Sequence, residues 1–185
     1  MLTNCYCTLT ELGRALGLDK QRQNQEKEKL ETAITHASRY IDFMTKRFFY
    51  KKSLTAELID VYQPSDNGIR MYDTDMLFPV PIISVTSLIE NGTALTVNID
   101  YWVYNALIQK KYAFSNERKA ISFTGDIGYI TTPAHINAFC IQLAEIFSKI
   151  GTRIISDEGG FSNSLSAYIP VWLRDSIRAE AVNHV

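Results

Sequence analysis

The chain has 185 residues, of which 21% are charged, and its formal net charge at pH 7 is -1. A chain of this length can bury a substantial core and is expected to form one domain, or one domain with an appendage. This composition excludes an intrinsically disordered protein and a strongly basic nucleic-acid-binding protein. Any contact with nucleic acid is therefore expected to be local or indirect.

The sequence predicts no membrane or secretory segment. It contains no run of about 18 apolar residues, and its N-terminus lacks the charged head and apolar core of a signal peptide. We therefore expect the protein to be made and kept in the cytosol. The three cysteines, Cys5, Cys7 and Cys140, would be free thiols in that reducing compartment.

Two helices are expected before residue 50. Residues 8–17 have a short apolar face, a threonine that can cap a helix, and Gly17 at the position that ends it. Residues 21–49 form a longer helical pattern in which apolar residues recur at steps of three and four. These residues predict one continuous core face: Leu30, Ile34, Ala37, Ile41, Met44 and Phe48.

A second, narrower set of side chains lies on the flank of the same pattern: His36, Tyr40, Phe43 and Arg47. Because the main stripe already supplies a core face, the aromatic flank predicts a second contact surface. Tyr40 and Phe43 are its interface candidates.

The middle of the chain, about residues 53–124, predicts a small antiparallel sheet. Short β-branched and aromatic runs alternate there with turn residues. Asn91-Gly92 between two such runs is typical of a β-hairpin, because both residues accept the positive φ angles of its turn. Gly125-Asp126-Ile127-Gly128 is expected to be the turn from the last strand to the next helix.

The helical pattern returns after Thr132-Pro133, a pair that favours a helix start, and continues to Gly151. Residues 156–167 are rich in Gly, Ser and Asn and predict a flexible loop. A final helix opens at Pro170. A hydrophobic helix on such a tether is expected to dock outside its own core, and its interface candidates are Trp172, Leu173 and Ile177.

Together these elements predict an α+β fold: mainly a helical bundle around a long central helix, with a small antiparallel β-sheet module inserted between helices. The expected domains are a main domain of residues 1–151, with its β module at about 53–124, and a segment of residues 152–185 made of the loop and the C-terminal helix.

No motif of a catalytic or metal site is present in the sequence. The three histidines have no nucleophile or carboxylate at a characteristic spacing, and the G-x-S-x-G, Walker and H-E-x-x-H motifs are missing. Cys5-x-Cys7 lacks the second pair of ligands that a zinc site needs. The sequence therefore predicts a protein that is not an enzyme and that has no cofactor.

One basic cluster follows the long helix: Lys46, Arg47, Lys51 and Lys52. Two interpretations are open. Cations near the C-terminal end of a helix are favoured by its dipole and need no ligand, whereas clustered basic side chains can also contact phosphates. These four residues are the candidates for a DNA contact.

Four stretches of the chain, taken in order, match the pattern of a known protein family. They are Leu9-Thr10-Glu11-Leu12 with Gly17, residues 33–49, residues 81–104, and Gly128-Tyr129 leading to Pro133-Ala134 and the helix to Phe147. The most specific is S-V-T-S-L followed by N-G-T and D-Y-W-V-Y, placed between two helices. With these stretches the chain, over residues 8–151, resembles the bacteriophage head-tail connector (adaptor) family.

This resemblance implies an α+β subunit that repeats around an axis, usually in about twelve copies, as a ring below the portal protein. Such a homo-oligomeric ring would extend the DNA channel and join the capsid to the tail. The implied partners are the portal protein, a tail or stopper protein and the double-stranded DNA in the channel. The implied location is the virion neck, after synthesis in the host cytoplasm.

Residues 152–185 have no firm counterpart in that family, so no residue roles are transferred to them. Two alternatives remain open from the residues alone. They are a small nucleic-acid-binding module and, less favoured, a small enzyme.

Overall fold

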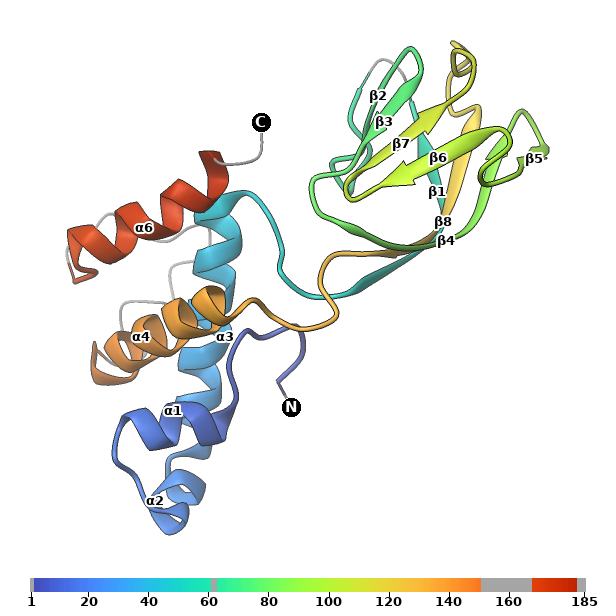
Figure 1. Ribbon diagram of the computed structural model, residues 1–185. Helices are drawn as coiled ribbons and strands as arrows, with labels where there is room; N and C mark the ends of the chain where they lie inside the picture. The colour runs from blue at the N-terminus through green and yellow to red at the C-terminus, as the bar shows by residue number, and fades with distance from the viewer. Residues whose placement is uncertain (1, 61–62, 151–167, 183–185) are drawn as a thin grey trace. The chain divides into compact units, whose positions relative to one another are not determined.

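Figure 1 shows the computed structural model of the chain, which describes residues 2–60, 63–150 and 168–182. The chain divides into two compact units. The first, which we call the helical unit, consists of Met1–Tyr50 and Thr132–Val185, and the second, the strand unit, is Lys51–Thr131. The loop predicted for residues 156–167 lies outside the described residues, and the division at residue 151 stays a prediction.

Five helices are described in the helical unit: α1 (Leu9–Ala15), α2 (Lys20–Gln25), α3 (Lys27–Thr45), α4 (Ala134–Ile150) and α6 (Val171–Val182). The start of α1 follows from Thr8, whose hydroxyl accepts the backbone N–H of Glu11 (3.2 Å) while the Glu11 carboxylate accepts the backbone N–H of Thr8 (2.7 Å). This reciprocal pair satisfies two donors that a helix start leaves open.

The helix predicted for residues 21–49 is broken near its start and ends early. Asp19 caps α2 by accepting the backbone N–H of Arg22 (2.8 Å). Because α2 has no buried residue, little packing holds it in line with α3, and the chain turns at Glu26. At the other end, Lys46 takes a left-handed conformation (φ 54°) that ends α3.

The core face predicted for α3 is buried at Leu30, Ile34, Ala37 and Ile41, while Met44 and Phe48 are half-buried. Both α4 and α6 pack against α3 (Figure 1). Tyr40, on the flank that the sequence assigned to a second contact surface, is buried as well, and its ring meets the Phe147 ring of α4 edge-on at 6.2 Å. Packing on two sides of α3 covers this part of the flank.

The strand unit consists of two antiparallel sheets of four strands each. The first has the order β1-β8-β4-β5, with β1 (Lys52–Ile59), β8 (Ile121–Ile127), β4 (Ile82–Glu90) and β5 (Thr93–Leu95). The second has the order β2-β3-β7-β6, with β2 (Arg70–Tyr72), β3 (Asp75–Leu77), β7 (Leu107–Lys110) and β6 (Tyr101–Tyr104). Phe78 and Phe123 pack ring against ring in the core, with centroids 5.0 Å apart.

The predicted fold class, a mainly helical bundle with one small sheet, is wrong, although α+β holds. In the described residues eight strands in two sheets stand beside five helices. The second sheet was not predicted because its two central strands, β3 and β7, have only three and four residues. So short a run does not display the alternation by which a strand is recognised.

The hairpin at Asn91-Gly92 is confirmed: β4 and β5 pair antiparallel across it, with φ of 48° and 79° at the two turn residues. The turn predicted for residues 125–128 is wrong for all but Gly128, since Gly125, Asp126 and Ile127 lie inside β8, which runs between β1 and β4. A Cβ at Gly125 would lie 2.3 Å from the Ser84 carbonyl oxygen. Glycine is therefore required there by a close backbone approach.

Candidate interaction surfaces

One face of the β2-β3-β7-β6 sheet exposes a group of apolar and aromatic side chains. Residues paired directly across strands point to the same side, and two rows of pairs run across all four strands. We call the surface made by these rows the outer sheet face. Its residues are Arg70, Leu77, Leu107 and Tyr104 in one row and Tyr72, Asp75, Gln109 and Trp102 in the other.

The outer sheet face exposes three large apolar or aromatic side chains. Tyr72 and Tyr104 are each 52% exposed and Leu77 is 42% exposed, whereas Met76 and Ile108, which point to the opposite side, are fully buried. Exposed apolar groups of this kind often mark contact sites. Sequence reasoning missed this face, because β3 and β7, the central strands that align its residues, were not recognised.

Phe43 lies on the exposed side of α3, as the aromatic flank predicted, and is 53% exposed. The Lys46 ammonium lies above its ring, 4.1 Å from the centroid. A cation over a ring face is attracted by the ring quadrupole, so this pair presents an aromatic and a positive group together near the end of α3.

The three interface candidates of α6 lie in different surroundings. Leu173 and Ile177 are fully buried in the helical unit, whereas Trp172 is 59% exposed. Val171 and Tyr168 beside it are also exposed. Of the predicted set, Trp172 is thus the side chain that α6 presents to solvent, while the other two are used in packing.

The four basic candidates for a DNA contact are divided between the two units, with Lys46 and Arg47 in the helical unit and Lys51 and Lys52 in the strand unit. Each of them contacts another side chain of its own unit. Lys46 lies over the Phe43 ring, and the Arg47 guanidinium lies 5.9 Å from the centroid of the Phe49 ring. In the strand unit Lys51 forms an ion pair with Asp126 (2.9 Å), and Lys52 donates a hydrogen bond to the Asn67 side chain. Hydrogen bonds from Ser53 and the Lys51 pair lower the pKa of Asp126, so this carboxylate is charged at neutral pH.

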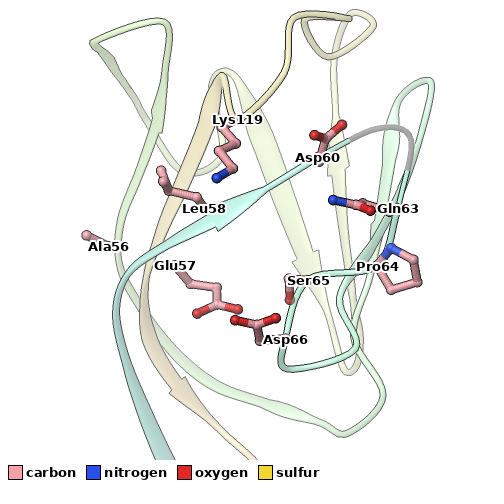
Figure 2. A pocket seen from close by; sticks show the side chains of 9 residues that line it. All are labelled: Ala56, Glu57, Leu58, Asp60, Gln63, Pro64, Ser65, Asp66 and Lys119. Carbon is pink, nitrogen blue, oxygen red and sulfur yellow. The ribbon is translucent and has the colours of Figure 1, made fainter.

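The strand unit has an open hollow of about 360 Å³ (Figure 2). Its side chains come from β1, from the loop that leads to β2, and from Lys119 just before β8. The lining is polar and carries three carboxyl groups, those of Glu57, Asp60 and Asp66. Together with Lys119 these groups give the hollow an acidic balance, and none of the predicted site residues lies in it.

A carboxyl group with a raised pKa, that of Asp42, lies in the helical unit. The Tyr6 hydroxyl donates a hydrogen bond to Asp42 and accepts one from the backbone N–H of Phe49 (2.9 Å). Arg39 forms an ion pair with the same carboxyl group (3.2 Å). Burial nevertheless raises the pKa of Asp42 to about 6, because removal from water disfavours the charged form.

No protein-family model matches the sequence, and no curated protein matches it. Among solved structures, the chain is similar to one from the neck of an empty GTA particle, computed with C6 symmetry, with a TM-score of 0.58 and 12% sequence identity. The likeness covers 96% of this chain and 92% of that chain. The two share a fold.

The likeness to the neck chain extends over both units rather than over one of them, because it leaves only a small part of either chain unmatched. Within residues 2–60, 63–150 and 168–182, no helix is long and apolar enough to cross a membrane. In the same described part of the chain, no three His, Cys, Asp or Glu side chains are placed to hold a metal ion.

Proposed function

We propose that the protein is a structural component of the neck of a phage-like particle, where it joins head to tail. The observation that carries this proposal is the fold shared with a neck chain over 96% of this chain and 92% of the other. GTA denotes a gene transfer agent, a phage-like particle. The independent resemblance of residues 8–151 to head-tail connector proteins supports the same role.

In its finer form, the proposal is a homo-oligomeric ring below the portal protein that extends the DNA channel towards a tail or stopper protein. The neck of the GTA particle was computed with six-fold symmetry. A ring of about twelve copies is compatible with that symmetry, with two copies in each repeat. Double-stranded DNA would pass through the ring without a sequence-specific contact.

Subunits in a ring meet their two neighbours through two different faces. Contacts with proteins above and below the ring require further surface. Among the described residues, we assign these contacts to Phe43 with Lys46, to Trp172 and to the outer sheet face. A neck component works through such surfaces, and we therefore propose that the protein is not an enzyme.

A nucleic-acid-binding module is less well supported. The ion pair of Lys51 with Asp126 offsets one of the four candidate charges, and the net charge of -1 gives little release of counterions on binding DNA. A contact of Lys46, Arg47, Lys51 and Lys52 with DNA in the channel stays a prediction.

Electron microscopy of labelled particles tests the proposal. A short epitope is inserted between Asn91 and Gly92, in the exposed turn that joins β4 to β5. Particles made with this chain, incubated with gold-labelled antibody, are expected to carry gold at the junction of head and tail. Particles with the untagged chain are the control. Gold on the capsid shell or along the tail, or intact particles without the chain, would contradict the proposal.

A further inference from the structure

Two thiols that are 133 residues apart in the sequence meet in the helical unit. The thiols of Cys140 on α4 and of Cys7 are hydrogen-bonded to each other, with 3.2 Å between the sulfur atoms. Cys140 is fully buried and Cys7 is 4% exposed. The third cysteine, Cys5, is half-buried, and its sulfur lies 3.9 Å from the Thr35 hydroxyl. One particular pair of thiols is thus held in contact.

The separation of Cys7 and Cys140 is close to that of a bonded pair. The sulfur atoms of a disulfide lie about 2 Å apart, so the two atoms need to approach by only about 1 Å from their present 3.2 Å. Rotation of a cysteine side chain can supply a movement of this size without moving the backbone far.

The polar surroundings favour ionisation of one thiol of the pair. The pKa of Cys140 is lowered, first by the hydrogen bond with Cys7 and then by the Ser38 hydroxyl (3.5 Å) and the backbone of Tyr6 and Cys7, which together outweigh its burial. The pKa of Cys7 is raised by the same contact and by burial. Cys140 therefore supplies the thiolate, which is the attacking form in thiol chemistry.

We propose that Cys7 and Cys140 form an intramolecular disulfide when the protein meets an oxidising environment. With glutathione disulfide as oxidant, the Cys140 thiolate attacks one of its sulfur atoms and releases one glutathione thiolate. The Cys7 thiolate then attacks the mixed disulfide at Cys140 and releases the second. The protein loses two electrons and two protons, and glutathione disulfide is reduced to two glutathione molecules.

The oxidant reaches this buried pair through a local opening of the segment before α1, which lies outside the helices and strands. Such segments open at lower free energy than the packed helices of the core. The bond would tie this segment to α4 and so secure Tyr6, which hydrogen-bonds to Ser38, Asp42 and Phe49 of the same unit. Thiols stay reduced in the cytosol and oxidise outside the cell, so the link would form after release from the cell. The chemistry does not depend on the proposed function.

The purified full-length chain, reduced and then exposed to glutathione disulfide at pH 8, tests this inference. Thiols are counted after unfolding, and intact mass is measured. The count is expected to fall from three to one, with a loss of about 2 Da and a cross-linked peptide that contains Cys7 and Cys140. In the Cys5→Ser variant the count is expected to fall from two to none. Cys7→Ser and Cys140→Ser, the matched variants, should form no intramolecular bond.

The melting temperature provides a second readout. Oxidation is expected to raise it by at least about 5 °C in the parent and in Cys5→Ser, and a reducing agent should reverse the rise. A thiol count that stays at three in the folded protein, a link that involves Cys5, a stable glutathione adduct or a disulfide-linked dimer would each overturn the inference. Because Cys5→Ser changes a half-buried side chain, the test stands even where a buried Cys→Ser variant does not fold.

Discussion

The Tyr6 hydroxyl accepts a hydrogen bond from the backbone N–H of Phe49, at 2.9 Å, across 43 residues of sequence. The two rings also meet edge-on, with centroids 5.8 Å apart. Tyr6 is buried, and Phe49 follows the end of α3, just before the sequence enters the strand unit at Lys51. The N-terminal segment therefore fixes the chain where it leaves the helical unit.

The first prediction is that Tyr6→Phe destabilises the protein by about 1 to 3 kcal/mol. The change removes one hydroxyl, leaving the buried Phe49 N–H without its acceptor and Asp42 without its donor. Urea unfolding measures the difference, with Tyr112→Phe, at a side chain that is 69% exposed, as the control. Equal stability of the two variants would show that the hydroxyl contributes nothing to the fold.

The second prediction concerns the pH dependence of stability. Because the pKa of Asp42 is raised to about 6 in the folded state, the unfolded state ionises first as pH rises from about 4. The contribution of Asp42 to stability is thus fully present below its unfolded pKa and is lost as pH rises through 6. The Asp42→Asn variant has no carboxyl group to ionise and so does not lose this stability. Its free energy of unfolding, relative to that of the parent, should increase by about 1 to 3 kcal/mol between pH 4 and pH 7.

Urea unfolding of the parent and of Asp42→Asn at intervals between pH 4 and pH 8 measures this difference. The asparagine side chain can still accept the Tyr6 hydroxyl, so the comparison isolates the charge. If the variant instead becomes less stable relative to the parent as pH rises, the ion pair with Arg39 outweighs the burial of Asp42, and the sign of the pKa shift is wrong.

The periodicity of the sequence was sufficient to predict four of the six residues of the core face as buried in α3, and the turn residues predicted the hairpin between β4 and β5. It could not place the end of α3, because Lys46 enters the left-handed region without the glycine that usually marks it. It missed the second sheet for a different reason, since strands as short as β3 and β7 gain their order from pairing with each other and with β2 and β6.

The candidate interface residues show a second limit of sequence reasoning. Tyr40, Phe43, Trp172, Leu173 and Ile177 look alike as apolar residues of amphipathic helices. Which of them stays exposed depends on the helices that pack beside each one, and the periodicity of one helix does not contain that information. Phe43 and Trp172 are exposed, while α3, α4 and α6 bury the other three.

The third prediction is that Gly125→Ala destabilises the strand unit by more than about 2 kcal/mol. The added Cβ would lie 2.3 Å from the Ser84 carbonyl oxygen and 3.2 Å from the Val85 Cα, which are backbone atoms that cannot rotate away. Gly92→Ala is the control, because a Cβ there meets nothing within 4 Å and only its φ of 79° is unfavourable, at a cost of about 1 kcal/mol. Equal losses in the two variants would contradict the close approach.

The fourth prediction is weak, salt-dependent binding of DNA by the isolated protein. With a net charge of -1 and Lys51 paired to Asp126, we expect a Kd no tighter than about 10⁻⁶ M at physiological salt, the range of non-specific binding. Fluorescence anisotropy with labelled duplex DNA at several salt concentrations measures it. Nanomolar binding that is lost in the variant with Lys46→Gln and Lys52→Gln would instead support a nucleic-acid-binding module.

The last prediction separates two neighbouring residues of α6 that the sequence treated alike. Leu173→Ala should destabilise the helical unit by about 2 to 5 kcal/mol, because it leaves a cavity at a fully buried position. Trp172→Ala should change stability by less than about 0.5 kcal/mol, since its side chain is 59% exposed. Exposed tryptophans often dominate interfaces, so we expect Trp172→Ala to fold normally and to be incorporated poorly into particles.

Quantitative mass spectrometry of purified particles measures this incorporation, with urea unfolding of the isolated variants alongside. Val171→Ala is the matched control, because Val171 is equally exposed (60%) on the same helix but offers far less area for a contact. Normal incorporation of Trp172→Ala would remove Trp172 from the interface. Unfolding of Trp172→Ala in isolation would show instead that this side chain stabilises the subunit itself. A residue used only for docking would not change the stability of the isolated protein.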